Sequence, residues 1–204
     1  AQKTGKATVL FVPSKLAAPT EPIKYSFGGT LSYLDPFTGT TVTRDLYPVV
    51  LTVNPSPDLT LDYFVQRDVL GDDALTKDVI EPSVPAEFSL LINNVGYGDA
   101  KKVNIATNQP EIVDNKKGLL IDFKMVGSRL NGHEKTSGFS KINFGSIPAH
   151  STAYAQWYFE SSLLGHFVKY NSSLTKGSSY GSEEFNIISK VSVHELIHTI
   201  SVND

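Results

Sequence analysis

The chain has 204 residues, of which 40% are hydrophobic and 19% are charged, and its net charge is −3. This composition is typical of a folded globular protein, and the weak negative charge gives no basis for binding nucleic acid or an anionic membrane. No apolar run approaches 18 residues and cysteine is absent, so we expect no membrane span, disulfide, thiolate zinc site or cysteine nucleophile.

The first quarter of the chain is rich in β-branched and aromatic residues. These favour strands at residues 7–12, 29–33 and 49–53. Residues 34–39 contain Asp, Pro and Gly between two such runs and predict a hairpin loop. The Asn-Pro-Ser-Pro stretch at 54–57 interrupts the pattern, because proline cannot donate to a β-ladder. We therefore predict an N-terminal β segment or small β domain (1–57) and a larger domain (58–204).

Strand signals recur along the larger domain and are separated by Gly, Pro and Asn. We expect these strands at residues 59–64, 86–92, 102–106, 118–124, 141–144 and 151–159. No amphipathic helix is indicated, except for one alternative near the C-terminus that is considered below. This spacing predicts an all-β fold, an antiparallel β-sandwich.

One of these segments, 151–159, has a clear two-residue period. Ala153, Ala155, Trp157 and Phe159 share one face, which we predict to be core, with Trp157 as its anchor. Tyr154, Gln156 and Tyr158 share the other face. Outward tyrosines are ordinary half-exposed strand residues or a platform on which a sugar ring can stack. Tyr154 and Tyr158, with Tyr97 and Tyr63, are therefore our candidate carbohydrate-binding residues.

Two further segments carry a family resemblance. Residues 92–103 (INNVGYGDAKKV) resemble the N-N-x-G-x-G-x-A-x-x-V hairpin of CARDB-like and related Ig-like modules. Residues 144–153 resemble that family's G-x-I-x-x-G-x-x-A turn and strand, with His150 in the place of the usual glycine. Asn94 and Gly96 suit a tight turn with positive φ. The resemblance covers about residues 84–170.

The resemblance implies an Ig-like sandwich from a large extracellular or cell-surface protein. It also implies which partners to expect: neighbouring modules, other copies of the chain, or a surface protein or glycan. The absence of cysteine fits such a protein. The family resemblance says little about chemistry, because sandwiches of this kind serve many functions.

The C-terminal sequence His194-Glu195-Leu196-Ile197-His198 matches the zinc-peptidase pattern H-E-x-x-H. On a helix, both imidazoles would reach one zinc ion, Glu195 would be the general base, and Asp204 would be a third ligand. On a strand, the two histidines would lie ~13 Å apart and could not share an ion. Eight of the sixteen residues from 187 to 202 are β-branched, which favours the strand.

Acidic residues are concentrated in one region, since residues 58–100 contain nine acidic and two basic residues. Within it, Asp68, Asp72, Asp73 and Asp78 fall in one predicted loop and are candidate calcium ligands. Aspartate is also a common turn former, and the spacing is not that of an EF-hand.

From the sequence we expect a non-catalytic structural or adhesive module that needs no cofactor. A zinc metallopeptidase and a carbohydrate-binding module are the alternatives.

Overall fold

The computed structural model describes residues 8–107, 122–136, 138–166, 172–176 and 187–196. The chain divides into two compact units, residues 1–56 and 57–204, each described by itself below. Within the described residues the secondary structure is almost entirely β, and the one helical element is the short 3₁₀ turn η1 (Lys15–Ala17). No helix in this part of the chain is long and apolar enough to cross a membrane.

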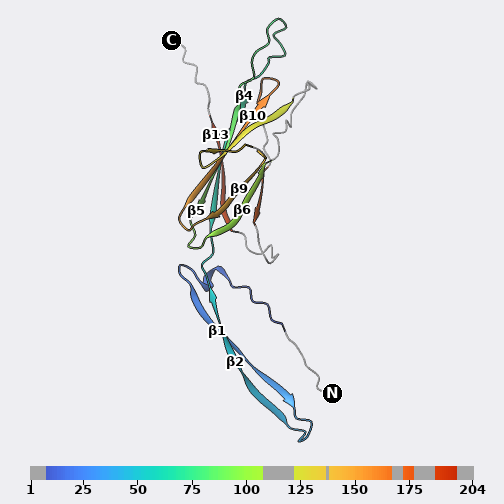
Figure 1. Ribbon diagram of the computed structural model, residues 1–204, viewed down its shortest axis with the longest axis vertical. Coiled ribbons are helices and arrows are strands. Elements are labelled where there is room, and N and C mark those ends of the chain that lie inside the picture. The colour runs from blue at the N-terminus through green and yellow to red at the C-terminus, as the bar shows by residue number, and fades with distance from the viewer. Residues whose placement is uncertain (1–7, 108–121, 137, 167–171, 177–186, 197–204) are drawn as a thin grey trace. The chain divides into compact units, whose positions relative to one another are not determined.

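The first unit is built on an antiparallel hairpin of two long strands, β1 (Ile23–Leu34) and β2 (Thr41–Val53) (Figure 1). The loop between them matches the hairpin loop predicted from the sequence. The strand predicted at 7–12 is wrong for its described residues, because 8–14 have no regular secondary structure. This segment packs side chains against the hairpin instead: the Phe11 and Phe27 ring centroids lie 4.3 Å apart.

The second unit is the predicted sandwich, with a larger and a smaller sheet (Figure 1). The six-stranded sheet has the order β13-β3-β5-β10-β7-β8, with bounds Ile188–Leu196, Leu59–Gln66, Ala86–Asn94, Thr152–Ser161, Phe123–Leu130 and His133–Glu134. The three-stranded sheet has the order β12-β6-β9, with bounds Ser172–Lys176, Ala100–Thr107 and Lys141–Ile147. The short strands β4 (Asp68–Val69) and β11 (Gly165–His166) pair with each other.

The pairing departs from the expected antiparallel arrangement at one edge. The last strand, β13, runs parallel to the first strand of the unit, β3. All other strand pairs described in this unit are antiparallel. Of the strand predicted at 118–124, residues 123–124 belong to β7 and residues 118–121 lie outside the described part of the chain.

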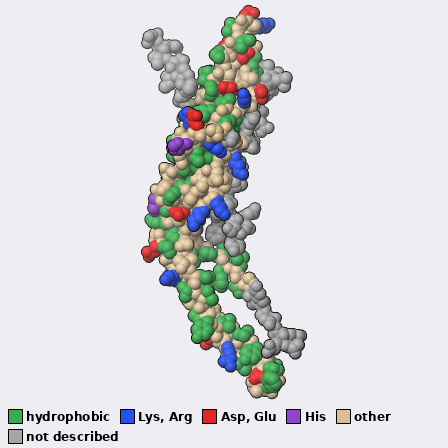
Figure 2. Space-filling view, viewed as in Figure 1, with side chains coloured by type: hydrophobic (Ala, Val, Ile, Leu, Met, Phe, Trp, Pro, Cys, Tyr) green, Lys and Arg blue, Asp and Glu red, His purple; other side chains and the backbone are tan. Residues whose placement is uncertain are grey.

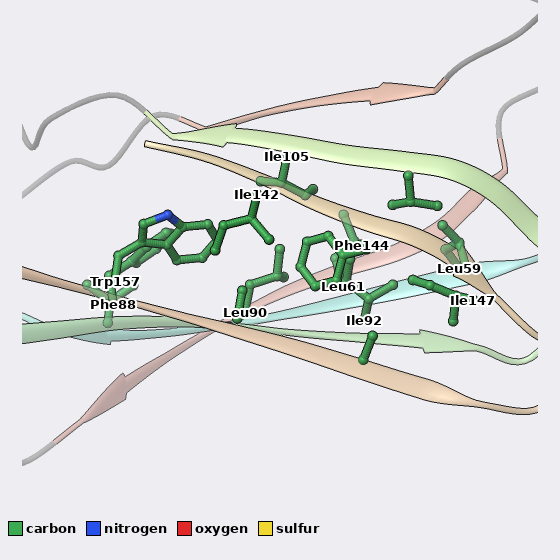
Figure 3. Close-up of a cluster of buried hydrophobic side chains, with 14 of the residues drawn as sticks. Leu59, Leu61, Phe88, Leu90, Ile92, Ile105, Ile142, Phe144, Ile147 and Trp157 are labelled. Atoms are coloured by element: carbon green, nitrogen blue, oxygen red, sulfur yellow. The ribbon is translucent and has the colours of Figure 1, made fainter. Parts of the chain in front are cut away.

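The core lies between the two sheets (Figure 3). The predicted alternation in β10 is confirmed, since Ala153, Ala155, Trp157 and Phe159 are buried and the intervening side chains are not. Trp157 contacts Phe88 of β5 with ring centroids 5.4 Å apart, and its indole N–H donates to the carbonyl of Phe139 at 2.9 Å. The smaller sheet contributes apolar side chains from β6 and β9: Val103, Ile105, Ile142, Phe144 and Ile147.

Asn94, at the end of β5, is a fully buried polar side chain that connects four segments. Its Nδ2 lies 2.9, 3.1 and 3.0 Å from the carbonyl oxygens of Gly98, Ile147 and Pro148. Its Oδ1 accepts from the backbone N–H groups of Asp58 and Gly96, each at 3.2 Å. One side-chain amide therefore forms hydrogen bonds with backbone groups at the start of β3, in the β5–β6 turn and at the end of β9.

The geometry of this turn corrects one expectation. Neither Asn94 nor Gly96 has a positive φ, and the Asn94 side chain shapes the turn instead. His150, which stands where the resembled pattern has glycine, does have a positive φ of 55°. That backbone region favours glycine, although asparagine, aspartate and histidine enter it more often than other residues.

We predict that Asn94→Ala destabilises the second unit by about 3 kcal/mol or more. The substitution removes five hydrogen bonds and leaves buried backbone groups without partners. Urea unfolding followed by tryptophan fluorescence measures this, because Trp157 is the only tryptophan.

The matched control is Asn93→Ala, a half-buried neighbour whose side chain points to the opposite face of β5. We expect a change within about 0.5 kcal/mol for this variant. Equal losses in the two variants would contradict the role assigned to Asn94.

Candidate interaction surface

The β1–β2 hairpin has one apolar face. Residues paired across an antiparallel ladder project to the same side of the sheet, and here one set of pairs is nearly all hydrophobic. We define the apolar face by these side chains: Ile23, Tyr25, Phe27, Leu31, Tyr33, Val42, Leu46, Val49, Leu51 and Val53. Arg44, opposite Leu31, is the one charged residue among these pairs. The other face is mostly Ser and Thr, with Lys24 and Asp45 and the two hydrophobic residues Leu34 and Val50.

A register shift keeps this face apolar along both halves of the hairpin. Phe27 pairs with Val49, but Gly29 pairs with Leu46, so β2 contains one extra residue at this point. Pro48 lies within the shift, where a residue without an N–H group is tolerated. Because a one-residue slip exchanges the two faces of a strand, the shift places Leu46 and Val42 on the apolar face instead of Tyr47 and Thr43.

Part of the apolar face is covered by residues 8–18, which we call the N-terminal strap. The Tyr25 hydroxyl donates to the carbonyl of Ala17 at 2.6 Å, and Ala18 is buried. Strap and strands enclose an open groove of about 580 Å³, which we call the basal groove. It is lined by Phe11, Val12, Pro13, Ala17, Tyr25, Phe27, Leu51, Thr52, Val53 and Asn54.

The part of the apolar face nearer the hairpin loop remains exposed (Figure 2). Leu31, Leu46 and Val49 expose 52%, 52% and 59% of their surface. An isolated two-stranded hairpin is marginal in water, and a sheet with one hydrophobic face normally packs that face against another layer. Among the described residues of the first unit, no second layer covers this part of the hairpin.

The candidate carbohydrate-binding tyrosines do not form one row of free rings. Tyr63 is on the inner face of β3, half-buried and stacked on Phe88 at 5.7 Å, so its assignment as an outward residue is wrong. Tyr97 packs edge-on against His150 with ring centroids 4.7 Å apart.

The other two tyrosines do lie on the outer face of β10. The guanidinium of Arg129 lies 5.4 Å from the Tyr158 ring centroid and donates to its hydroxyl at 3.3 Å. Tyr154 is exposed and lines a shallow depression with Phe64 and Leu196. Of these two rings, the one on Tyr158 already has a cation over it.

The H-E-x-x-H sequence lies on a strand as far as the structure describes it. His194, Glu195 and Leu196 belong to β13, and His198 and Asp204 lie outside the described residues. The helix that a zinc peptidase needs is therefore not formed at residues 194–196. The β-branched flanks account for this, because they add β13 to the edge of β3 in parallel.

The side chains of this motif interact with neighbouring strands. His194 Nε2 lies 2.9 Å from Asp62 Oδ1, and its ring stacks on Phe64 at 4.9 Å. The hydrogen bond from His194 holds the pKa of Asp62 below its usual value. Glu195 forms an ion pair with Arg67 at 2.8 Å. The carboxylate that would be the general base is thus paired with a guanidinium.

The four candidate calcium ligands are not gathered around one point. Asp68 belongs to β4, the carboxylate of Asp72 accepts from the backbone of Glu81 at 3.0 Å, and that of Asp73 accepts from the backbone of Leu75 at 2.9 Å. Asp78 is exposed. Within the described ranges, no group of three or more His, Asp or Glu side chains is arranged to hold a metal ion. The carboxylates of Asp72 and Asp73 stabilise the loop by accepting these backbone hydrogen bonds.

The same loop contains an acidic residue that sequence reasoning missed. The Glu81 carboxylate accepts from the backbone N–H of Asp73 at 3.1 Å and from the hydroxyl of Thr76 at 2.9 Å. These hydrogen bonds lower its pKa. Its role is local, since it closes the 72–81 loop on itself.

The chain matches none of the family models, curated proteins or solved structures with which it was compared. The likeness to CARDB-like modules therefore stays a prediction from two sequence segments. The assignment of an interaction surface rests on the geometry of this chain alone.

We predict that His194→Ala raises the pKa of Asp62 toward its usual value, because the hydrogen bond that lowers it is lost. An NMR titration of the Asp62 carboxyl measures the shift. Glu195→Gln is the control, since it breaks the neighbouring pair with Arg67. A pKa that responds to both substitutions equally would contradict the pairing.

The same pair predicts a pH dependence of stability. A carboxyl whose pKa is lowered on folding stabilises the protein above its unfolded pKa, and this is lost as the pH falls through the folded pKa. The stability difference between the wild type and Asp62→Asn should therefore shrink on acidification through that range. Urea midpoints measured at successive pH values test this, and a difference that grows on acidification would contradict it.

Proposed function

We propose that this chain is a non-catalytic structural or adhesive module that acts through protein–protein contacts with copies of itself. The proposal rests on the apolar face of the β1–β2 hairpin, about half of which no described residue of the first unit covers. Contiguous apolar patches of this kind mark interaction surfaces in soluble proteins. Among the described strands, β1 and β2 pair only with each other, so their outer edges offer backbone hydrogen-bonding groups to another chain.

In this proposal the second unit is a rigid support. Its core and the buried Asn94 hydrogen bonds belong to a well-packed sandwich, and His194 and Glu195 are paired with Asp62 and Arg67. An extracellular or cell-surface location is part of the proposal. It is supported by the CARDB-like sequence segments and by the absence of cysteine.

The two alternatives have less support. A zinc peptidase needs a helix where residues 194–196 form a strand, and it needs Glu195 free as a base. A carbohydrate-binding module needs a row of accessible rings, whereas Tyr63 is half-buried against the core and Tyr158 has Arg129 over its ring.

We predict that Leu31→Lys combined with Leu46→Lys weakens self-association at least tenfold. These side chains are exposed on the apolar face, and the loss of about 1.4 kcal/mol of apolar contact corresponds to a factor of ten. Sedimentation velocity over a range of concentrations measures it. The wild type should associate reversibly, and the double variant should remain monomeric over the same range.

The matched control adds the same charges to the other face of the hairpin, as Thr30→Lys with Thr43→Lys. This variant should associate like the wild type. A wild type that stays monomeric, or two double variants that behave alike, would contradict the proposal. Far-UV circular dichroism checks that both variants keep their strand content.

A further inference from the structure

The hairpin carries a second apolar feature at its loop. Phe37, in the turn between β1 and β2, exposes 96% of its surface. We propose that Phe37 of one copy inserts into the basal groove of a second copy, so that chains join head to tail. This inference rests on the proposed function and specifies the contact by which copies associate.

The turn holds Phe37 in a defined position. Asp35 Oδ1 accepts from the backbone N–H of Phe37 at 2.8 Å, and the Asp35 backbone exchanges hydrogen bonds with Thr40 and Gly39 at 2.9 and 2.8 Å. The hydroxyls of Thr38 and Thr40 are 2.8 Å apart. Gly39 has a φ of 65°, which closes the turn. A preordered loop loses little conformational entropy on binding, so its exposed ring is suited to be a docking group.

The basal groove has the size and chemistry to accept a phenyl ring. Its volume is about 580 Å³, whereas a cavity of about 150 Å³ is enough for benzene. Phe11, Tyr25 and Phe27 contribute aromatic rings to the lining. Pairs of aromatic rings attract each other more than the area that they bury accounts for. An aromatic side chain is therefore a better occupant than an aliphatic one.

A Phe37 ring that enters the groove must come from another copy. The groove lies at Phe27 and Val53, and the loop begins after Leu34. Seven residues of strand separate Phe27 from Leu34, which is roughly 23 Å at about 3.3 Å per residue. A chain cannot fill its own groove with its own Phe37.

The charges around the two sites are compatible with this contact. Lys15, in η1 between two residues that line the groove, is exposed. Asp35 is the nearest charged residue to Phe37 in the turn. Opposite charges at the two sites favour their approach and make the contact weaker at high salt.

A contact between two different surfaces of the same molecule does not close on itself unless a ring forms. Head-to-tail interfaces of this kind generate rings where the rotation between copies closes and open chains where it does not. The structure thus assigns to the hairpin a donor end and an acceptor end, and both are present in every copy.

Site-directed disulfides test the contact directly, because the chain has no cysteine of its own. We would prepare Thr38→Cys in the turn and Val12→Cys at the groove as separate full-length variants, and mix them under mild oxidation. We expect a disulfide-linked heterodimer to form at least fivefold faster than in a mixture of Thr38→Cys with Thr43→Cys, which carries its thiol on the polar face.

The role of the ring is tested in the same assay. Phe37→Ser added to the Thr38→Cys chain should abolish the enhanced cross-linking. Tyr47→Ser is the matched control, since Tyr47 is 98% exposed on β2 outside the groove and the turn; it should leave the rate unchanged. Equal rates for the groove and polar-face thiols, or a rate that does not depend on Phe37, would overturn the head-to-tail contact.

The outcomes separate this inference from the proposed function. If Phe37→Ser associates like the wild type while Leu31→Lys with Leu46→Lys does not, copies meet through the apolar face and the head-to-tail contact is wrong. If the wild type itself stays monomeric, the proposed function and this inference both fail. Association that is lost in Phe37→Ser, together with selective cross-linking, supports both.

Discussion

The second unit depends on a single buried amide. Asn94 binds backbone groups at the start of β3, in the turn that leads into β6, and at the end of β9. These segments belong to both sheets, so the side chain fixes how one sheet begins relative to the other. A buried polar group is costly unless every donor and acceptor is satisfied. Here the amide has partners on both its nitrogen and its oxygen, and the apolar core can close around it.

The two units differ in how far the hydrophobic face of their sheet is covered. In the sandwich, β6 and β9 cover the inner face of the larger sheet, and Trp157 and its neighbours are inaccessible to water. In the hairpin, the N-terminal strap, whose one regular element is the short turn η1, covers only the base of the apolar face. The described residues of the first unit leave the rest of that face exposed. This contrast is the physical basis for assigning support to one unit and contact to the other.

The sequence predicts the parts of this architecture that depend on local pattern. The period of two in 151–159 placed Trp157 and Phe159 in the core, and the prolines at 55 and 57 marked the change of unit. It could not predict the partner of each strand. The strap has strand-forming residues, but it packs against the hairpin through Phe11 and forms no strand. The parallel pairing of β13 depends on β3, which lies more than a hundred residues earlier in the chain. The apolar face was visible as an alternation from Ile23 to Tyr33, but its continuation on β2 required the register shift at Pro48.

The parallel pairing of β3 with β13 has a mechanical consequence. The chain enters this pair at Leu59 and leaves it at Leu196, and because the strands run in the same direction these points lie at opposite ends of the ladder. A tensile force applied between them loads the inter-strand hydrogen bonds in shear, all together, instead of opening them one at a time. Such a ladder yields only when its hydrogen bonds break together, so the sandwich would resist a force applied between Leu59 and Leu196.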